Sequence, residues 1–344
     1  MNASVTVQPA RWPGGARARR LASSPALRLS GRRLLSAIPV LWGVTFLTFL
    51  TLNALPGDAA SALLGINATP AEIRAFSIKL HLNEPLWVRY GHWLGGVVHG
   101  NLGSSLASPQ TVASVLEQRL PVTLELVAYA LVITFVVSIP LAVLCAYRPR
   151  GLTDRLCMVL SMCGISIAPY VLGLLLVLFF AVDIPIFPAI GYQSIGAGIA
   201  GNLKDLTLPA IVVALPLAAF YTRFLRADLL EQMQSEDYIV TARAKGLRPW
   251  RVLTQHALRN SFIGLLTVIG LNLATLIGST VIVEQIFSLP GIGYELLQAI
   301  SNRDVPVVEG IVLVFGAVVV LANLATDLLY GVLDPRIRHV RSRS

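Results

Sequence analysis

Six long apolar runs, separated by shorter polar segments, divide this sequence. Each run has about the length that a helix needs to cross the hydrocarbon core of a membrane, roughly 20 residues. Prolines lie within or beside several runs, and membrane helices tolerate them where neighbouring helices satisfy the freed carbonyls. The pattern predicts an all-α polytopic membrane protein with six transmembrane helices, at Leu34–Leu55, Leu126–Tyr147, Leu156–Val182, Leu206–Thr222, Phe262–Val283 and Gly310–Tyr330.

The charges between these runs indicate an orientation. With the amino terminus placed in the cytoplasm, 21 of the 27 lysines and arginines fall on the cytoplasmic side. Cytoplasmic loops of membrane proteins carry such an excess of positive charge. We therefore expect two cytoplasmic tails (1–33 and 332–344), a first helix with an external loop (34–110), and a helical core (111–331) that contains a cytoplasmic loop (228–260).

The first 33 residues contain seven arginines and no acidic residue, as transit peptides and the first part of signal peptides do. The run that follows, Leu34–Leu55, would form a helix of about 33 Å, which is longer than the core of a signal peptide. We expect it to be kept as the first membrane helix, and a removable transit peptide is the alternative.

The external loop carries the signals of folded structure. Thr69 and Glu72 have the spacing of a capping box around Pro70, which suits the first position of a helix running to about Leu80. A second helix is expected after Pro85. It contains two tryptophans and a tyrosine, residues that favour the membrane interface.

Composition supports the membrane assignment. The chain of 344 residues is 55% hydrophobic and 13% charged, with a mean hydropathy of +0.71, which is too apolar for a soluble domain of this size. Its net charge of +9 lies at the ends of the apolar runs and forms no single stripe, so nucleic-acid binding is not expected. The three cysteines lie in or beside apolar runs, where they predict packing residues.

The segment Tyr238–Asn260 is a basic, half-polar island between two apolar runs. A helix is expected to open at Ser235 and to end at Gly246, because glycine readily takes the left-handed conformation that closes a helix. Pro249 suits the first turn of a second short helix, running through Leu258. Small residues (Ala242, Ala244, Gly246) would let a partner approach the backbone, and Lys245, Arg248 and Arg251 surround them with positive charge. The alternative is an ordinary positively charged cytoplasmic loop.

The chain has no phosphate-binding loop of its own. Such a loop needs a Gly-Lys-Ser or Gly-Lys-Thr sequence, and the three lysines (Lys79, Lys204, Lys245) follow Ile, Leu and Ala. ATP-driven work would therefore need an ATPase partner. All five histidines lie outside the apolar runs, so neither a metal site nor histidine-based catalysis is expected in the membrane.

Polar residues within the runs are few. Asn272, Asn323 and Asp327 are the main candidates for a transport path, since intramembrane polar groups often mark one. Packing or interface roles are the alternative for all three. Small residues in the fifth run (Gly264, Gly270, Ala274 and Gly278) recur at spacings that allow close helix packing.

Several segments resemble one family from about Arg33 to Arg338. They are NEPLWVRYGHWLGGVVHGNLGSSL, RLPVTLELVAYALVITFVVSIPLAVLCA, TARAKGL, HALRN, GSTVIVEQIFSLPGIGYELLQAI, NRDVPVVEG and DLLYGVLDPRIR. The chain resembles the first permease subunit of dipeptide, oligopeptide and nickel ABC importers, which have the type I ABC importer permease fold. In the general coupling-loop pattern of these permeases, Val240 stands where an acid is usual and Arg259 where a proline is usual.

The resemblance implies a membrane subunit that takes part in peptide import without being an enzyme. Its partners would be a second homologous permease, two ABC ATPases that bind the ATP and Mg²⁺, an external substrate-binding protein and the lipid bilayer, with no cofactor in this chain. The family's coupling helix would map onto Glu236–Lys245, and the residues expected to contact an ATPase are Glu236, Tyr238, Thr241, Ala242, Ala244, Lys245, Gly246, Leu247 and Arg251.

Other functions stay open at the level of sequence. A self-sufficient channel or secondary carrier would work without an ATPase, and the substrate could be nickel or a glycosylated peptide, as in some relatives. An intramembrane enzyme would need a nucleophile and a base, and neither is visible within the runs. The external loop is either a folded cap without a ligand or the surface that meets the substrate-binding protein.

Overall fold

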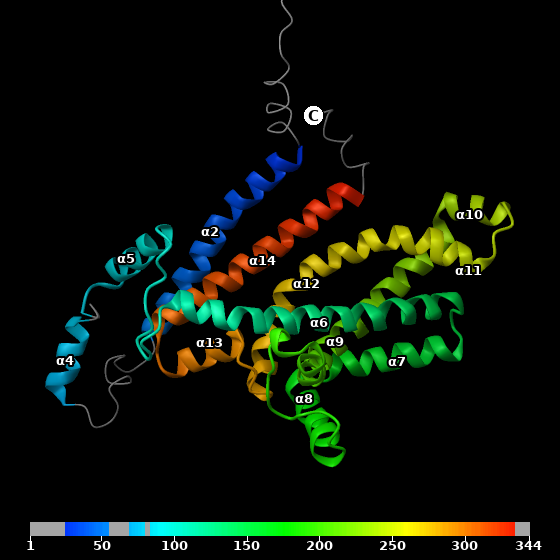
Figure 1. Ribbon diagram of the computed structural model, residues 1–344. Coiled ribbons are helices and arrows are strands. Elements are labelled where there is room, and N and C mark those ends of the chain that lie inside the picture. The colour runs from blue at the N-terminus through cyan, green and yellow to red at the C-terminus, as the bar shows by residue number, and fades with distance from the viewer. Residues whose placement is uncertain (1–24, 55–68, 80–82, 334–344) are drawn as a thin grey trace, which may run out of the picture.

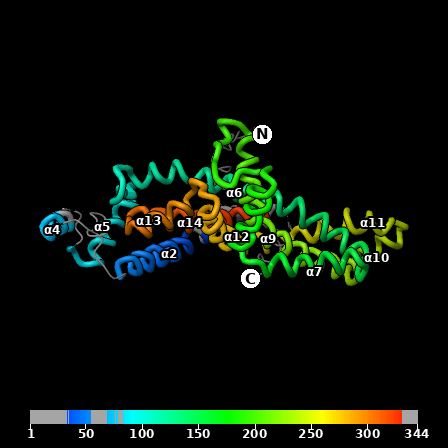
Figure 2. Tube along the Cα trace, turned by 90° about the horizontal axis from the view of Figure 1, so that it is seen from below, coloured from blue at the N-terminus to red at the C-terminus, as the bar shows by residue number. Residues whose placement is uncertain are grey.

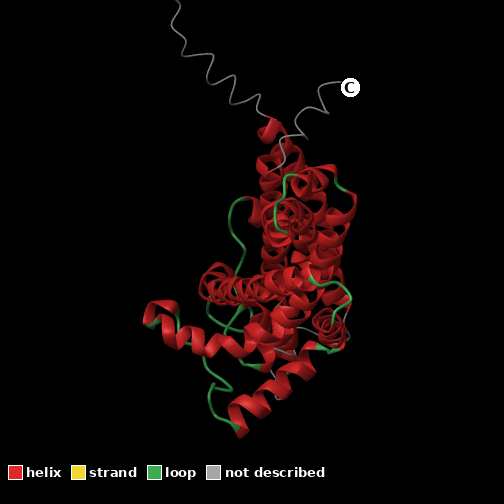
Figure 3. Ribbon diagram, turned by 90° about the vertical axis from the view of Figure 1, so that its right-hand side faces the viewer, coloured by secondary structure: helices red, strands yellow, loops and turns green. Residues whose placement is uncertain are grey.

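The computed structural model describes residues 25–54, 69–79 and 83–333 (Figure 1). Most of the amino-terminal tail and all but two residues of the carboxy-terminal tail lie outside these ranges. Within the described residues the chain is helical, and its β-structure is a single bridge between Ser104 and Thr111. Figure 3 shows helices joined by short loops, in agreement with the all-α prediction.

Five of the described helices are long and apolar enough to cross a membrane. Each contains or largely overlaps one of the predicted runs, although most extend well past it. The helices are α2 (Pro25–Ala54), α6 (Val112–Tyr147), α9 (Ile199–Ser235), α12 (Leu258–Ile286, which continues a helix that begins at Pro249) and α14 (Val305–Leu333). The predicted run Leu206–Thr222 was too short, because the helix that contains it extends to 37 residues.

The third predicted span, Leu156–Val182, is not one straight helix. It is divided into α7 (Leu152–Ser166) and α8 (Pro169–Val177), which continues as the π-helix η1 (Leu178–Asp183), and the two parts meet at 100°. The bend falls at Ile167 and Ala168, which are extended. Proline disfavours helical conformation in the residue before it, so Pro169 ends one helix and begins the next.

The main core lies where α6 and α9 pack along each other, with α8 and α12 against them. Its centre consists of fully buried aliphatic side chains, including Leu126, Ala130, Ala210, Val212 and Leu276. The helix α7 packs on α9 at Gly164, where an added Cβ would lie 3.2 Å from the Cβ of Ala219. Close approach at a small residue is the usual way in which membrane helices pack.

Two helices that the sequence predicts after the first membrane helix are present among the described residues. The backbone N–H of Thr69 donates to Glu72 (2.8 Å), and the backbone N–H of Glu72 donates to the hydroxyl of Thr69 (3.3 Å), which completes the capping box of α4 (Pro70–Lys79). The second helix, α5 (Leu86–Val98), packs on α2, where the hydroxyl groups of Tyr90 and Thr45 lie 2.9 Å apart.

A buried carboxylate organises the turn that follows α12. Glu284 is fully buried, and its carboxylate accepts hydrogen bonds from the hydroxyl of Thr123 (2.6 Å) and the backbone N–H of Tyr294 (2.9 Å). The same hydroxyl accepts a bond from the backbone N–H of Ile292 (2.9 Å), at the start of α13 (Ile292–Ser301). Together these bonds join α6, α12 and α13.

Candidate coupling surface

The basic island lies at one end of the molecule. Figures 1 and 2 both place α10 (Asp237–Ala244) and α11 (Pro249–Arg251) at the opposite end from α4 and α5. The long helices α6, α9 and α12 run between the two ends (Figure 1). The basic island and the helices of the external segment therefore lie at opposite ends of the helical core.

The helix α10 begins two residues later than predicted. Ser235 is the last residue of α9, and its hydroxyl donates to the carbonyl of Glu231 (2.7 Å). The chain leaves the helix at Glu236, which is extended and precedes the first helical residue, Asp237. The acidic side chain of Asp237 lies in the first turn, where it favours the positive end of the helix dipole.

Gly246 closes α10 as predicted, with a left-handed φ of +76°. The N–H of Gly246 donates to the carbonyl of Arg243 (2.9 Å), and the N–H of Leu247 donates to the carbonyl of Ala242 (3.3 Å). These two bonds are those of a Schellman motif, which satisfies carbonyls that the end of a helix leaves unpaired. No atom lies within 4 Å of a Cβ built on Gly246, so a larger side chain would meet no obstacle there. Glycine is favoured at this position because of its left-handed backbone conformation.

The helix after Gly246 is much longer than predicted. Helical structure begins at Pro249, passes through α11 and the π-helix η3 (Val252–Ala257), and continues into α12 as far as Ile286. The expected end at Leu258 was wrong. The apolar run that follows keeps the chain helical, and nothing between Leu258 and Phe262 terminates a helix: both Arg259 and Asn260 occur in helix interiors.

The inner face of α10 packs on the protein itself. Ile239 and Ala242 are buried against Leu225 and Leu229 of α9 and against Val252. The expectation that Ala242 lets a partner approach was wrong, because that side chain points into this cluster. The exposed expected residues are Glu236, Tyr238, Thr241, Ala244, Lys245, Gly246 and Arg251, while Leu247 is half-buried.

Hydrogen bonds fix α10 to its neighbours. The amide oxygen of Gln232 in α9 accepts from the hydroxyl of Tyr238 (2.6 Å) and from the side-chain amide of Asn260 (2.9 Å). The guanidinium of Arg243 donates to the carbonyl of Met233 (3.0 Å). Burial, followed by the negative charge of Glu236, raises the pKa of Tyr238 above its ordinary value, so its hydroxyl keeps the proton that it donates.

Sequence reasoning missed three residues that shape this end, namely Gln232, Trp250 and Tyr147. Gln232 joins α9, α10 and α12, as described above. Trp250 packs edge-on against Tyr147, the last residue of α6, with ring centroids 5.3 Å apart, and about half of the Trp250 side chain stays exposed. An aromatic residue so close to a helix start, in a loop rich in arginine, was the available signal for this contact.

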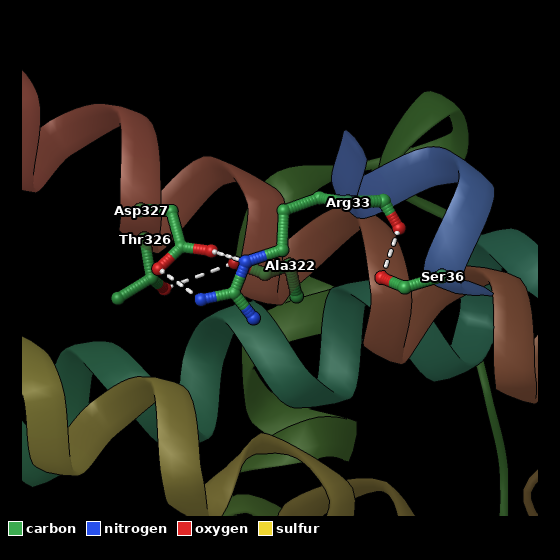
Figure 4. Close-up of polar contacts among 5 residues, drawn as sticks. All are labelled: Arg33, Ser36, Ala322, Thr326 and Asp327. Carbon is green, nitrogen blue, oxygen red and sulfur yellow. Dashed lines mark hydrogen bonds and ion pairs between the residues drawn. The ribbon is translucent and has the colours of Figure 1, made fainter. Parts of the chain in front are cut away.

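The candidate path residues lie on two helices that meet, since an added Cβ on Gly270 of α12 would lie 3.0 Å from Thr326 of α14. Asn272 donates to the carbonyl of Val268 within its own helix (2.9 Å), and Asn323 is exposed on α14. Figure 4 shows that Asp327 pairs with Arg33 of α2. Among the hydrogen bonds of the described residues, none joins Asn272 to either of the other two, and Asp327 contacts the first membrane helix.

Two family models match the chain. The model described as "Binding-protein-dependent transport system inner membrane component" matches residues 138–339, and its companion for the N-terminal part matches residues 26–127. Among curated proteins, the chain is 39% identical over 308 residues to a probable peptide ABC transporter permease, y4tP, of Sinorhizobium fredii, a match that covers 90% of this chain and 98% of the relative. It is 36% identical over 311 residues to the oligopeptide transport system permease protein AppB of Bacillus subtilis, covering 90% of this chain and 98% of AppB.

Proposed function

Because the chain belongs to the family of binding-protein-dependent transport system inner membrane components, we propose that it forms half of the membrane path of an ATP-driven peptide importer. It is a multi-pass inner-membrane protein and a transport permease subunit. Peptide is the proposed substrate because relatives that match the chain over most of their length are named as peptide and oligopeptide permeases. In this proposal a second, homologous permease supplies the other half of the path.

The exposed face of α10 and α11 is the observation that carries the coupling role. It presents Val240, of which 60% is exposed, together with Trp250, beside the cations Lys245, Arg248 and Arg251. Exposed apolar side chains that gather within a rim of polar residues mark interaction sites, whereas single exposed apolar side chains are ordinary. An apolar groove with an acidic rim, on an ATPase subunit, would complement this face.

The ATPase is assigned to partner subunits because this chain lacks the phosphate-binding sequence. Each of its lysines follows a residue other than glycine, so no Gly-Lys-Ser or Gly-Lys-Thr loop can form. Two ATPases would bind ATP with Mg²⁺ below the permease pair. A substrate-binding protein would deliver peptide on the side of α4 and α5, with both termini of this chain in the cytoplasm.

The packing of α10 suggests how the two ends are coupled. Ile239 and Ala242 join α10 to α9 and η3, and both neighbours continue directly into membrane helices. When the ATPases close on ATP, a contact that differs between their two states would shift α10 and tilt those helices with it. The path would then open to one side of the membrane and afterwards to the other.

Ala244→Trp tests this assignment, because Ala244 is exposed on α10 and outside its packed face. The variant should reach the membrane and bind the second permease, while peptide uptake and transport-linked ATP turnover fall about tenfold or more, as expected for a bulky residue in a contact centre. Ala325→Trp, the same change at an exposed position of α14, away from α10 and from the side of α4 and α5, is the matched control. Normal uptake by Ala244→Trp, or peptide flux through the purified chain without ATP, would overturn the proposal.

A further inference from the structure

An apolar groove lies between the first and last membrane helices. α2 and α14 pack side by side along the molecule (Figure 1). The groove has a volume of about 370 Å³, and side chains from both helices line it: Leu35, Ala37, Ile38 and Leu41 from α2, with Ala317, Val320 and Leu321 from α14. The two alanines are the smallest side chains of this lining.

Both ends of the groove are closed by contacts between the two helices. At one end, Gly316 allows close packing, since a Cβ there would lie 2.6 Å from a methyl group of Leu41. At the other end, the carboxylate of Asp327 lies 3.0 Å from Nε of Arg33 and accepts a hydrogen bond from Nη2 (3.3 Å), as Figure 4 shows. Arg33 and Leu41 are eight residues apart, which is about 12 Å along a helix.

The charged end of the groove lies at the edge of the membrane span. The apolar part of α2 begins at Leu35, two residues after Arg33. The side chain of Arg33 is 58% exposed, and a guanidinium has N–H donors on Nη1 besides those that face Asp327. Arg28 and Arg32 precede Arg33 on α2, and no acidic residue lies between Pro25 and Arg33, so this edge attracts anions.

We propose that the groove binds an acyl chain of an anionic phospholipid, with the phosphate of that lipid on the exposed side of Arg33. The groove is about 12 Å long, so it takes the part of one extended acyl chain that lies next to the headgroup. A protein helix is about 10 Å across with its side chains, so it would rest on the groove without entering it. The basic edge supplies the headgroup contact that a zwitterionic lipid would use less well.

The test uses the full-length chain, purified in detergent and stripped of lipid. Phosphatidylglycerol and phosphatidylcholine with identical acyl chains are added in turn, and native mass spectrometry measures the lipid that stays bound. The unchanged protein should retain phosphatidylglycerol in preference to phosphatidylcholine. Equal retention of both lipids would overturn the role of Arg33.

Ala317→Leu enlarges a side chain that lines the groove and should weaken retention roughly tenfold, the effect of losing about two buried methylene groups. Ala325→Leu makes the same change at an exposed position of the same helix, outside the groove, and should behave as the unchanged protein. Equal retention by the two variants would overturn the proposal. Loss of a dimer in Ala317→Leu, without loss of lipid, would also overturn it, since a second copy would then occupy the groove.

The double variant Arg33→Gln with Asp327→Asn removes the ion pair without leaving either charge alone. It should still bind lipid but lose the preference for phosphatidylglycerol, and an unchanged preference would contradict the headgroup contact. A second measurement needs no variant. Phosphatidylglycerol with a photoreactive acyl chain should label 35–41 and 317–321 of the unchanged protein, and labelling confined to other helices would overturn the site.

Discussion

Arg226 in α9 and Asp154 in α7 form a two-point ion pair that joins these helices near the end where α10 lies. The Nη2 group of Arg226 donates to Asp154 (2.7 Å), and Nε contacts the second carboxylate oxygen. The carboxylate also accepts the backbone N–H of Arg150 (2.8 Å). The side chain of Asp154 is only 4% exposed, so its charge depends on these partners.

Removing one member of this pair should cost more than removing both. Asp154→Ala leaves the guanidinium of Arg226 without its partner, and we expect a loss of about 2–4 kcal/mol in the free energy of unfolding. The double variant Asp154→Leu with Arg226→Leu should recover much of that loss, because no charge is left alone. Unfolding by denaturant in a mild detergent measures both. If the single and double variants lost the same free energy of unfolding, the pair would contribute through packing and not through its charges.

Thr123→Val should loosen the turn after α12. Valine has the shape of threonine without the hydroxyl, so the variant removes a donor to Glu284 and an acceptor for the N–H of Ile292. Each buried group left unpaired costs about 1–3 kcal/mol. We expect faster hydrogen exchange at Ile292 and a lower unfolding midpoint. Thr123→Ser keeps the hydroxyl and should retain slow exchange; fast exchange in both variants would contradict the role of the hydroxyl.

Gln232→Leu should free α10 from its neighbours. The substitution removes the oxygen that accepts from Tyr238 and Asn260, two bonds worth about 1 kcal/mol each. Hydrogen exchange in α10 should quicken, while exchange in the middle of α9 stays slow. If α10 transmits motion from an ATPase, ATP turnover should fall less than peptide uptake. Gln234→Leu, at an exposed position two residues away, is the control and should change neither.

Gly246 offers a test of backbone conformation alone. A left-handed residue costs about 1–2 kcal/mol when it carries an ordinary side chain, and no atom lies close enough to clash with an added Cβ. Gly246→Ala should therefore weaken the end of α10 by about 1 kcal/mol, seen as faster exchange of the Leu247 amide. Gly246→Asn should be milder, because asparagine tolerates this conformation. Equal effects of the two would mean that size matters at this position and conformation does not.

The capping box of α4 should depend on pH. The backbone N–H of Thr69, followed by its hydroxyl, holds the pKa of Glu72 below its ordinary value. The lowered pKa means that the folded helix binds the proton of Glu72 less readily than the unfolded chain does. The ionised carboxylate therefore stabilises α4 at pH values above the ordinary pKa, and this stabilisation is lost as the pH falls through the lowered pKa. The protection of the amides at the start of α4, relative to their intrinsic exchange rate at each pH, should fall in this acidic range. Glu72→Gln should remove the dependence, and a persisting dependence would point to another group.

Much of the fold could be predicted because its causes are local. The lengths of the apolar runs located the membrane helices, Thr69 and Glu72 located the start of α4, and Gly246 located the end of α10. These features depend on residues a few positions apart. Ala242 could also have been assigned to the packed face, because Ile239 precedes it by three positions and the pair lies on one side of a helix.

The remaining features depend on contacts between distant residues. Arg33 and Asp327 are 294 positions apart, and no periodicity in the sequence relates them. Pro169 indicates a break, but the 100° bend also needs Gly173, which lets α8 approach Ile286 of α12. Nothing in the local sequence distinguishes Gln232, because its role depends on the fold that places Tyr238 and Asn260 beside it.

The helix that begins at Pro249 has a mechanical consequence. It continues for 38 residues to Ile286, which corresponds to about 57 Å, and it carries Trp250 near one end and Glu284 near the other. A stiff rod of this length magnifies rotation: a pivot of about 5° at one end sweeps the other through about 5 Å, roughly the pitch of one helical turn. A small rotation at the end that carries Trp250 would then change the packing around Glu284 on the far side of the bilayer.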